Sequence, residues 1–166
     1  MESHFESLQT LDGQEWGADR FNGKVTVVSF TDQKGQEASA KAGSALGKRY
    51  MDNEAFQIVT AVKVPSMFKG LAATLLKAGQ VKARESAVKR FESEGKPVPA
   101  GLAERIHVVF DINGKCSGSA LGDWKEGQAQ LLLVDGSGTI CARSSNKDAV
   151  AAVEALAPKL DELLKA

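Results

Sequence analysis

The order of apolar and polar positions in the first third of the chain indicates two buried strands with a helix between them. Residues 24–30 and 56–64 are runs of β-branched and apolar side chains, which are typical of strands inside a sheet. Residues 36–51 are rich in alanine and alternate charged with small residues, which favours a helix. This spacing predicts a βαβ unit with two parallel strands.

A long helical segment and a third strand follow. Residues 66–92 carry apolar side chains broadly on one side of a helix, and Gly79 predicts a break or bend near its middle. These apolar residues are Phe68, Leu71, Leu75, Ala78, Val81, Val88 and Phe91. Two prolines end the helical insertion, which spans residues 66–101. Residues 106–110 are apolar again and predict the third strand.

The C-terminal part of the chain predicts a hairpin and a final helix. Residues 130–134 and 139–143 flank the turn sequence Asp-Gly-Ser-Gly, which indicates an antiparallel hairpin. A helical apolar stripe follows, with Ser145 or Asn146 as its N-cap. Pro158 interrupts this stripe, and because proline lacks an N–H and clashes with an earlier carbonyl, we expect a kink just before it.

The N-terminal residues 1–23 contain two turn signals, Asp12-Gly13 and Asn22-Gly23, and predict a small hairpin ahead of the main sheet. All these elements belong to a single domain over residues 1–166. The composition is that of an ordinary globular domain, with 43% hydrophobic and 25% charged residues. A chain of this size buries about 70% of its unfolded surface on folding, so it needs no disulfide or structural metal.

The charge balance favours no anionic partner. Lysine and arginine together number 21, as do aspartate and glutamate, so the net charge gives no bias toward nucleic acid or an anionic membrane. No apolar run approaches the roughly 18 residues of a membrane span. The first residues carry Glu2 and Glu6 and no apolar signal region, so we expect a cytoplasmic protein, or a periplasmic one if a signal peptide has been removed.

Three segments of the sequence resemble the redoxins, the group that holds peroxiredoxins and thioredoxin-like thiol reductases. LQTLDGQEWGADRFNGKVTVVSF is similar to the redoxin opening, and IHVVFDINGK and LLLVDGSGTI are similar to two later strands with their turns. The resemblance implies an α/β thioredoxin-like fold with a central mixed five-stranded sheet. The implied strand order is 106–110, 56–62, 25–30, 130–134 and 139–143, with the first three strands parallel.

The catalytic residues of the redoxins have no counterpart in this chain. Their nucleophilic cysteine follows the first core strand, where a helix N-terminus lowers its pKa. Residues 31–38 occupy that stretch here and contain no cysteine. The proline that usually precedes the fourth core strand is also missing, from residues 127–130. The resemblance therefore predicts the scaffold without its thiol chemistry.

Cys116 and Cys141 are the only thiols and the candidate redox residues. Two cysteines in a cytosolic chain are more often small apolar residues than a redox pair. The resemblance places them near opposite edges of the sheet, too far apart for a disulfide, so we expect both to be unbridged. His4 and His107 are the only histidines, and we expect no metal or other cofactor and a structural role for His107.

The loop between the first strand and its helix is the main candidate site. Its N–H groups at the helix start point outward, and we expect the loop 31–37 to lie beside residues 127–130 and form a shallow polar groove. The groove residues are Thr31, Asp32, Lys34, Gln36, Glu37 and Gln128. A solvated loop that merely keeps the geometry of a redoxin is the alternative.

These observations leave three functions open. The first is a non-catalytic redoxin-fold module for protein binding or assembly, which is not an enzyme. The second is a divergent thiol-dependent oxidoreductase or peroxidase that uses Cys116 or Cys141. The third is a small-ligand carrier that uses the former active-site cleft.

A partner protein is expected, of unknown identity. The helical insertion is basic and the N-terminus is acidic, so the insertion could bind an acidic partner or the N-terminus of a second copy in a homo-oligomer, although exposed helices commonly carry such charges. Its basic residues are Lys69, Lys77, Lys82, Arg84, Lys89 and Arg90. Trp16 and Trp124 are expected to be packing residues, because no basic and aromatic interleaving surrounds them.

Overall fold

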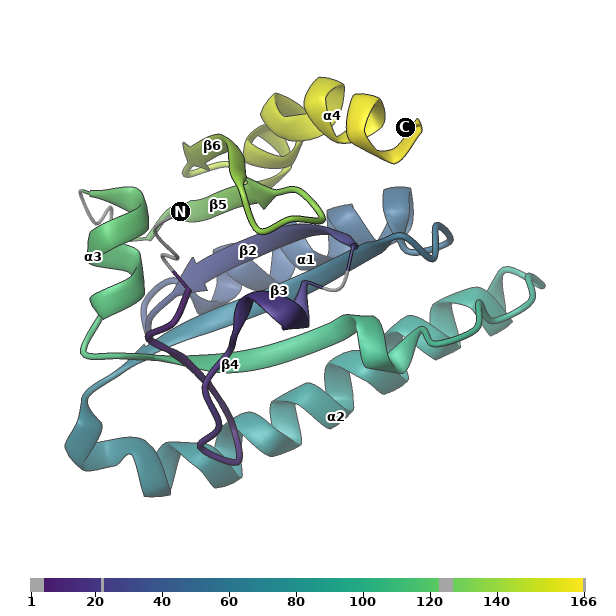
Figure 1. Ribbon diagram of the computed structural model, residues 1–166. Coiled ribbons are helices and arrows are strands. Elements are labelled where there is room, and N and C mark those ends of the chain that lie inside the picture. The colour runs from purple at the N-terminus through teal and green to yellow at the C-terminus, as the bar shows by residue number, and fades with distance from the viewer. Residues whose placement is uncertain (1–4, 22, 123–126, 166) are drawn as a thin grey trace.

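A mixed sheet of six strands forms the centre of the computed structural model, which describes residues 5–21, 23–122 and 127–165 (Figure 1). The strand order is β1-β4-β3-β2-β5-β6, with β2, β3 and β4 parallel and the other strands antiparallel to their neighbours. The strands are β1 (Leu8–Thr10), β2 (Val25–Thr31), β3 (Phe56–Val64), β4 (Ile106–Ile112), β5 (Ala129–Val134) and β6 (Ile140–Asn146). The predicted order of five strands is confirmed, and β1 is added beyond β4.

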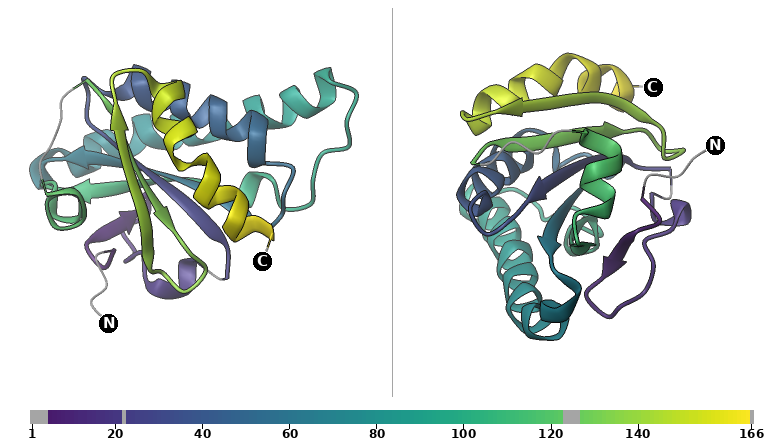
Figure 2. Two further views of the ribbon diagram at one scale, coloured as in Figure 1. Left: turned by 90° about the horizontal axis from the view of Figure 1, so that it is seen from above. Right: turned by 90° about the vertical axis from the view of Figure 1, so that its left-hand side faces the viewer.

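Helices and the N-terminal segment cover the two faces of this sheet. In the right-hand view of Figure 2, α1 and α2 lie to one side of the strands, and the N-terminal segment lies to the other. The helices are α1 (Gln36–Tyr50), α2 (Lys69–Ser93), α3 (Lys115–Leu121) and α4 (Ala149–Lys165), with short 3-10 turns η1 (Ala18–Arg20), η2 (Ser66–Phe68) and η3 (Ala103–Arg105). None of the helices in the described ranges is long and apolar enough to cross a membrane.

Alternate residues of β2 belong to two different cores. Val25 and Val27 join a cluster that includes residues of α1 and α4, whereas Val28 and Phe30 join a second cluster with Trp16 on the opposite face. Strand side chains alternate between the two faces of a sheet, so a strand covered on both sides must be apolar or paired at every position. All seven residues of β2 are buried.

The outer edge of β4 is protected by two different elements. Strand β1 pairs with β4 at residues 109–111. Beyond that point Gln80 of α2 accepts a hydrogen bond from the N–H of Val108, and Arg84 Nε donates to the carbonyl of Ile106. An edge strand with unpaired backbone groups is a template for aggregation, so the helical insertion and the N-terminal strand together close this edge.

Helix α2 differs from the expectation for it in two ways. It is one continuous helix of 25 residues that passes through Gly79 without a break. Its apolar residues also divide between two faces: Phe91 is buried and Val88 is half-buried, whereas Phe68, Leu71 and Leu75 are exposed. The side buried toward the sheet uses Ala72, Ala73 and Leu76 instead. Spacing alone could not tell which of two apolar stripes faces the sheet.

The start and the interior of α4 also differ from expectation. Asp148 caps the helix, because its Oδ1 accepts hydrogen bonds from the N–H groups of Val150 and Ala151, so the cap is neither Ser145 nor Asn146. The helix continues through Pro158, because buried apolar residues on both sides of it pack on one core, and this packing outweighs the lost hydrogen bond. Helix α3 was not expected at all.

A buried arginine ties the start of β4 to the turn between α1 and β3. Arg105 is only 2% exposed. Its Nη1 donates to the carbonyls of Asn53 (2.9 Å) and Phe56 (2.8 Å), and its Nη2 donates to that of Met51 (2.8 Å). One guanidinium therefore donates to three backbone carbonyls, of which that of Asn53 also accepts a hydrogen bond from the N–H of Phe56.

Arg105→Met should lower the free energy of unfolding by about 3 kcal/mol, because it removes three hydrogen bonds to backbone carbonyls while keeping most of the side-chain volume. Urea unfolding measures the loss. Lys96→Met, at an exposed position, is the control and should change stability by about 0.5 kcal/mol or less. Equal stability of the two variants would show that Arg105 does not hold the turn.

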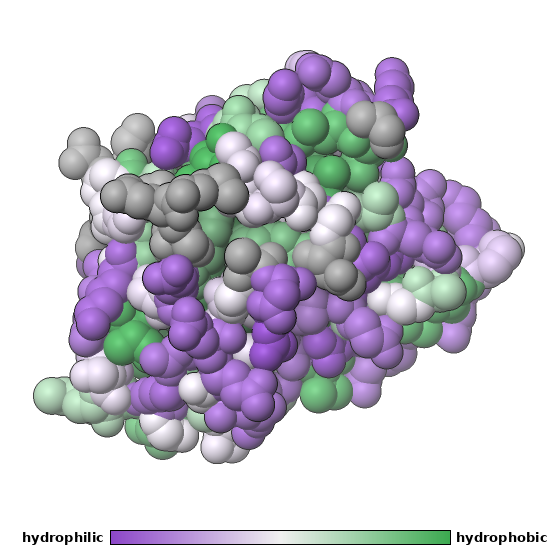
Figure 3. Space-filling view, in the orientation of Figure 1, coloured by the Kyte–Doolittle hydropathy of each residue, from purple (hydrophilic) through white to green (hydrophobic). Residues whose placement is uncertain are grey.

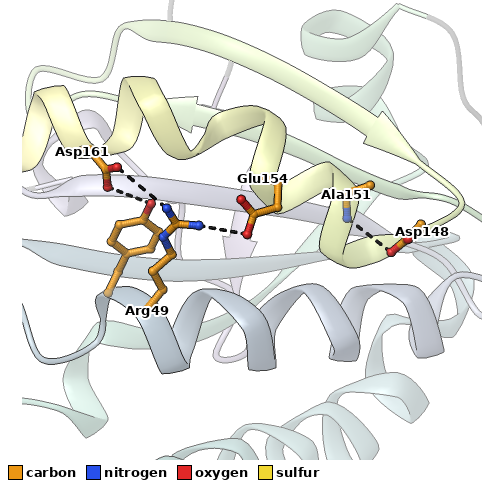
Figure 4. A network of polar contacts seen from close by, with 6 residues as sticks. Arg49, Asp148, Ala151, Glu154 and Asp161 are labelled. Atoms are coloured by element: carbon orange, nitrogen blue, oxygen red, sulfur yellow. Dashed lines mark hydrogen bonds and ion pairs between the residues drawn. The ribbon is translucent and has the colours of Figure 1, made fainter.

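A polar network joins the end of α1 to α4 (Figure 4). Tyr50 Oη donates to Asp161 Oδ1 (3.0 Å), and Arg49 Nη1 donates to Glu154 Oε1 (2.9 Å). Burial and the hydrogen bond to Asp161 raise the pKa of Tyr50 to about 12. The phenol is therefore held in its neutral, donating form.

Tyr50→Phe should reduce stability by about 1–2 kcal/mol near neutral pH, because it removes the hydrogen bond to Asp161 and keeps the ring. The pKa of Tyr50 is raised from about 10 in the unfolded chain to about 12 in the folded one. Its contribution is therefore complete below about pH 10 and is lost as the pH rises toward 12. Urea unfolding of both proteins should show the difference shrinking across this window, and a constant difference would contradict the assignment.

Candidate functional site

The loop that follows β2 is a turn organised by one carboxylate. Asp32 Oδ1 accepts hydrogen bonds from the N–H of Lys34 (3.0 Å) and of Gly35 (2.9 Å). Thr31 is buried, and its Oγ1 donates to the carbonyl of Asp32 (2.9 Å). Helix α1 begins at Gln36, immediately after Gly35. The Thr31 hydroxyl and the Asp32 carboxylate therefore both hold the turn that immediately precedes α1.

The start of β5 lies beside the end of β2. Phe30 pairs with Gln130 in the antiparallel register, so Asp32 and Gln128 each lie two residues beyond the last pair, at the same end of the sheet. This confirms the expected proximity of the two segments. Gln36 and Glu37 form the first turn of α1, where Glu37 makes an exposed ion pair with Lys41. A groove between the two segments remains a prediction.

The electrostatics of the loop favour a negative charge, and Asp32 supplies it. A helix N-terminus carries unpaired N–H groups and a partial positive charge. Residue Asp32 places an anion there already, so a second anion would meet repulsion. The loop is also fixed to the sheet below it, because the buried hydroxyls of Ser29 on β2 and Ser39 on α1 share a hydrogen bond (2.9 Å).

Gly35 is the residue immediately before α1, and it is buried. A Cβ atom added at this position would lie 3.0 Å from Thr31 Oγ1 and 3.5 Å from Asp32 Oδ1. Any side chain placed at the helix start would therefore lie against the Asp32 carboxylate. A thiolate in this place would be disfavoured by the nearby negative charge.

Solved structures of several bacterial proteins resemble this chain. A secreted disulfide oxidoreductase of Mycobacterium tuberculosis is 16% identical, covers 96% of this chain and 98% of its own, and has a TM-score of 0.53. A thioredoxin-like protein of Porphyromonas gingivalis is 16% identical, with 95% and 88% covered and a TM-score of 0.57. A lipoprotein thioredoxin of Streptococcus pneumoniae is 16% identical, with 94% and 97% covered and a TM-score of 0.51.

The chain has a thioredoxin-like fold. The likeness extends over nearly the whole chain and agrees with the observed strand order. No protein-family model and no curated protein sequence matches the chain. At this level of identity the likeness concerns the fold, and the chemistry has to be argued from the residues at the end of β2.

Both thiols lie away from the position where a redoxin keeps its nucleophile. Cys116 lies on α3, and burial together with the nearby Asp111 carboxylate raises its thiol pKa. Cys141 lies on the edge strand β6, and partial burial and Asp135 raise its thiol pKa. Both cysteines are free, as expected. Each is protonated to a greater extent than an ordinary cysteine, which makes it a weaker nucleophile.

The histidine that can be described is part of the packing. His107 on β4 lies edge-to-face against Trp16, with ring centroids 5.1 Å apart, and burial lowers its pKa to about 4. Trp16 is 2% exposed, which confirms its expected packing role. No group of three histidine, cysteine or acidic residues suited to a metal ion occurs within the described ranges. His4 and Trp124 lie outside those ranges.

Two surface cavities lie at the opposite end of the sheet from the loop. One has a volume of about 440 Å³ and lies beside Tyr50 and Asp161. The other, of about 390 Å³, lies beside Lys24, Arg105 and His107. Helix α1 and the parallel strands run in opposite directions, so the end of α1 and the starts of β2 and β4 share this end. Neither cavity includes a residue of the predicted groove.

Sequence reasoning missed what two of the residues do. It placed Asp32 among the residues of a predicted groove, whereas the carboxylate also accepts the hydrogen bonds of the turn from the N–H groups of Lys34 and Gly35. The signal was present, because aspartate three residues before a glycine commonly accepts such backbone hydrogen bonds. Arg105 gave no signal, since its three acceptors are separated from it by about fifty residues of sequence.

A cysteine introduced at position 35 should have a thiol pKa that depends on the Asp32 carboxylate. In a background without Cys116 and Cys141, Gly35→Cys should have a thiol pKa about one unit higher than the same cysteine combined with Asp32→Asn, because the carboxylate opposes the thiolate. The pH dependence of alkylation by iodoacetamide measures both values. Equal pKa values would mean that Asp32 does not act on the helix start.

Proposed function

We propose that this protein is a non-catalytic module of thioredoxin-like fold that binds another protein through the loop at the end of β2. One observation carries the proposal: the turn before α1, where a redoxin would hold its thiolate, has no cysteine and holds the Asp32 carboxylate, bonded to the N–H groups of Lys34 and Gly35. The scaffold is therefore present without a nucleophile in this turn. Because a fold alone does not imply a function, the proposal rests on the residues of the loop.

The rival function, a thiol oxidoreductase or peroxidase, is less well supported by the two cysteines. Thiol chemistry needs an accessible thiolate, and burial and nearby carboxylates raise the thiol pKa of both Cys116 and Cys141. Cys116 is completely buried. Neither thiol has the lowered pKa that a helix start gives a nucleophile.

The loop offers a mixed set of charges to a partner. Asp32 and Glu37 are acidic and Lys34 is basic, while Gln128 can both donate and accept hydrogen bonds. Such a surface suits a polar protein segment better than a single ion, because it matches groups of both signs. A small-ligand carrier is less well supported, since the two described cavities lie at the other end of the sheet.

The first experiment tests for catalysis. Reduced protein should show no turnover of hydrogen peroxide and no reduction of insulin disulfides above the level of the Cys116→Ser and Cys141→Ser double variant, because neither thiol is activated. The double variant keeps the loop at the end of β2 and serves as the matched control. Turnover that depends on either cysteine would overturn the proposal and favour the oxidoreductase.

The second experiment tests the binding surface. A partner captured from the cells of origin should lose affinity by about tenfold or more when Asp32, Lys34 and Gln128 are all changed to alanine, because these side chains contact it. The control variant changes Glu94 and Lys96, an exposed ion pair elsewhere, and should bind normally. Thermal unfolding checks that the triple variant is folded. Unchanged affinity in a folded triple variant would show that the partner binds elsewhere.

A further inference from the structure

The cavity of about 390 Å³ lies where the parallel strands begin, and its wall is polar. It brings together η1, the segments that lead into β2 and β3, and η3 with the start of β4. Among the described residues that line it, only Ala100 has an apolar side chain. Figure 3 shows mainly hydrophilic side chains on the right-hand side of the view, the side on which β2 and β4 begin in Figure 1. The cavity therefore suits a small polar ligand, since ligand pockets range from about 300 to 1,000 Å³.

The charged side chains of this wall do not pair with one another. They are Asp19, Arg20, Lys24, Glu54, Glu104 and Arg105. Lys24 Nζ donates to the backbone carbonyl of Glu54 (3.2 Å), and Arg20 Nη2 donates to the amide oxygen of Gln14 (2.9 Å). Within residues 5–21, 23–122 and 127–165, no ion pair joins any two of these charged groups. His107 adds no charge near neutral pH, because burial lowers its pKa to about 4. Positive and negative groups therefore line one cavity without neutralising each other.

Two buried side chains of the wall each keep a polar atom without a partner. Arg105 is 2% exposed, and its Nε makes no hydrogen bond in the described structure. Gln57 is buried to the same extent, and its Nε2 donates to the carbonyl of Arg20 (3.2 Å) and to Thr26 Oγ1 (2.9 Å). No described residue donates to Gln57 Oε1, so this oxygen can accept a hydrogen bond from a ligand. Buried polar groups are nearly always hydrogen-bonded, so such groups without partners beside a cavity indicate a ligand.

The guanidinium of Arg105 gives the wall a buried positive charge. Its hydrogen bonds go to three neutral carbonyls, and burial lowers its pKa. Glu54 and Asp52 oppose that lowering, but neither forms an ion pair with it. A buried charge without a paired counter-charge is costly, so this charge favours a carboxylate in the cavity. The oxygen of Gln57 and the carboxylates of Glu54 and Glu104 favour an ammonium group, which carries N–H donors.

We propose that this cavity binds a small zwitterion with one carboxylate and one primary ammonium group, the chemistry of a free α-amino acid. The ligand carries both signs because the wall does, and its cation carries N–H donors because Gln57 presents an acceptor. A quaternary ammonium group has no N–H and cannot satisfy that oxygen. The inference goes beyond the proposed function, because it concerns the end of the sheet opposite the loop after β2. It also differs from a carrier that uses the former active-site cleft.

Amide NMR spectra of the unmodified protein test the ligand class. Each proteinogenic amino acid is added singly at about 10 mM, enough to detect a Kd near 1 mM. At least one should shift the side-chain amide signals of Gln57 and the backbone amide signals of Glu54 and Glu104. Glycine betaine, which keeps the carboxylate and has methyl groups in place of the ammonium hydrogens, should leave these signals unchanged. The proposal is overturned if no amino acid shifts them, or if glycine betaine shifts them equally.

Substitutions that remove one charge from the wall test the contacts. For the amino acid that binds most tightly, Lys24→Gln and Glu54→Gln should each weaken affinity by about tenfold, because each removes a charge-assisted interaction. Lys159→Gln and Glu162→Gln alter an exposed ion pair on α4, serve as matched controls and should bind normally. Thermal unfolding checks that every variant is folded. Unchanged affinity in either folded variant of the wall would contradict the proposed site.

Discussion

The central strand β2 is covered on both faces of the sheet, and none of its seven residues is exposed. Such a strand has to pair on both edges, which β3 and β5 do, and it has to be covered by helices on one face and by the N-terminal segment on the other. The chain leaves the core only where β2 ends, after Thr31. The loop that follows is therefore held between a rigid strand and the start of α1.

The position of this loop does not depend on which side chains the loop carries. The end of β2, the start of α1 and the start of β5 meet whether or not a cysteine is present, because strand pairing and burial position them. The identity of a few loop residues then decides what the helix start does. Here Asp32 accepts the hydrogen bonds of the turn, Gly35 removes the side chain at the helix start, and the remaining thiols lie elsewhere with raised pKa values.

The sequence predicted the strands, which are long apolar runs. It did not predict which face of α2 packs on the sheet, nor the short helix α3. The order and direction of β4, β3, β2, β5 and β6 are confirmed, since buried strands and βα connections leave a clear pattern. The faces of α2 could not be assigned, because the helix carries one apolar stripe for the sheet and another that is exposed. Helix α3 has only seven residues, too few for a periodic signal, and its start depends on the buried Asp111 carboxylate.

The amide proton shifts of Lys34 and Gly35 give the most direct test of the turn that Asp32 holds. Both amides donate to the Asp32 carboxylate, so both signals should move together when Asp32 is changed to alanine and this acceptor is removed. The amides of Ser137 and Thr139, which donate to the Asp135 carboxylate, provide the comparison within the same spectra and should keep their positions. Lys34 and Gly35 signals that stay fixed in this variant would contradict the account.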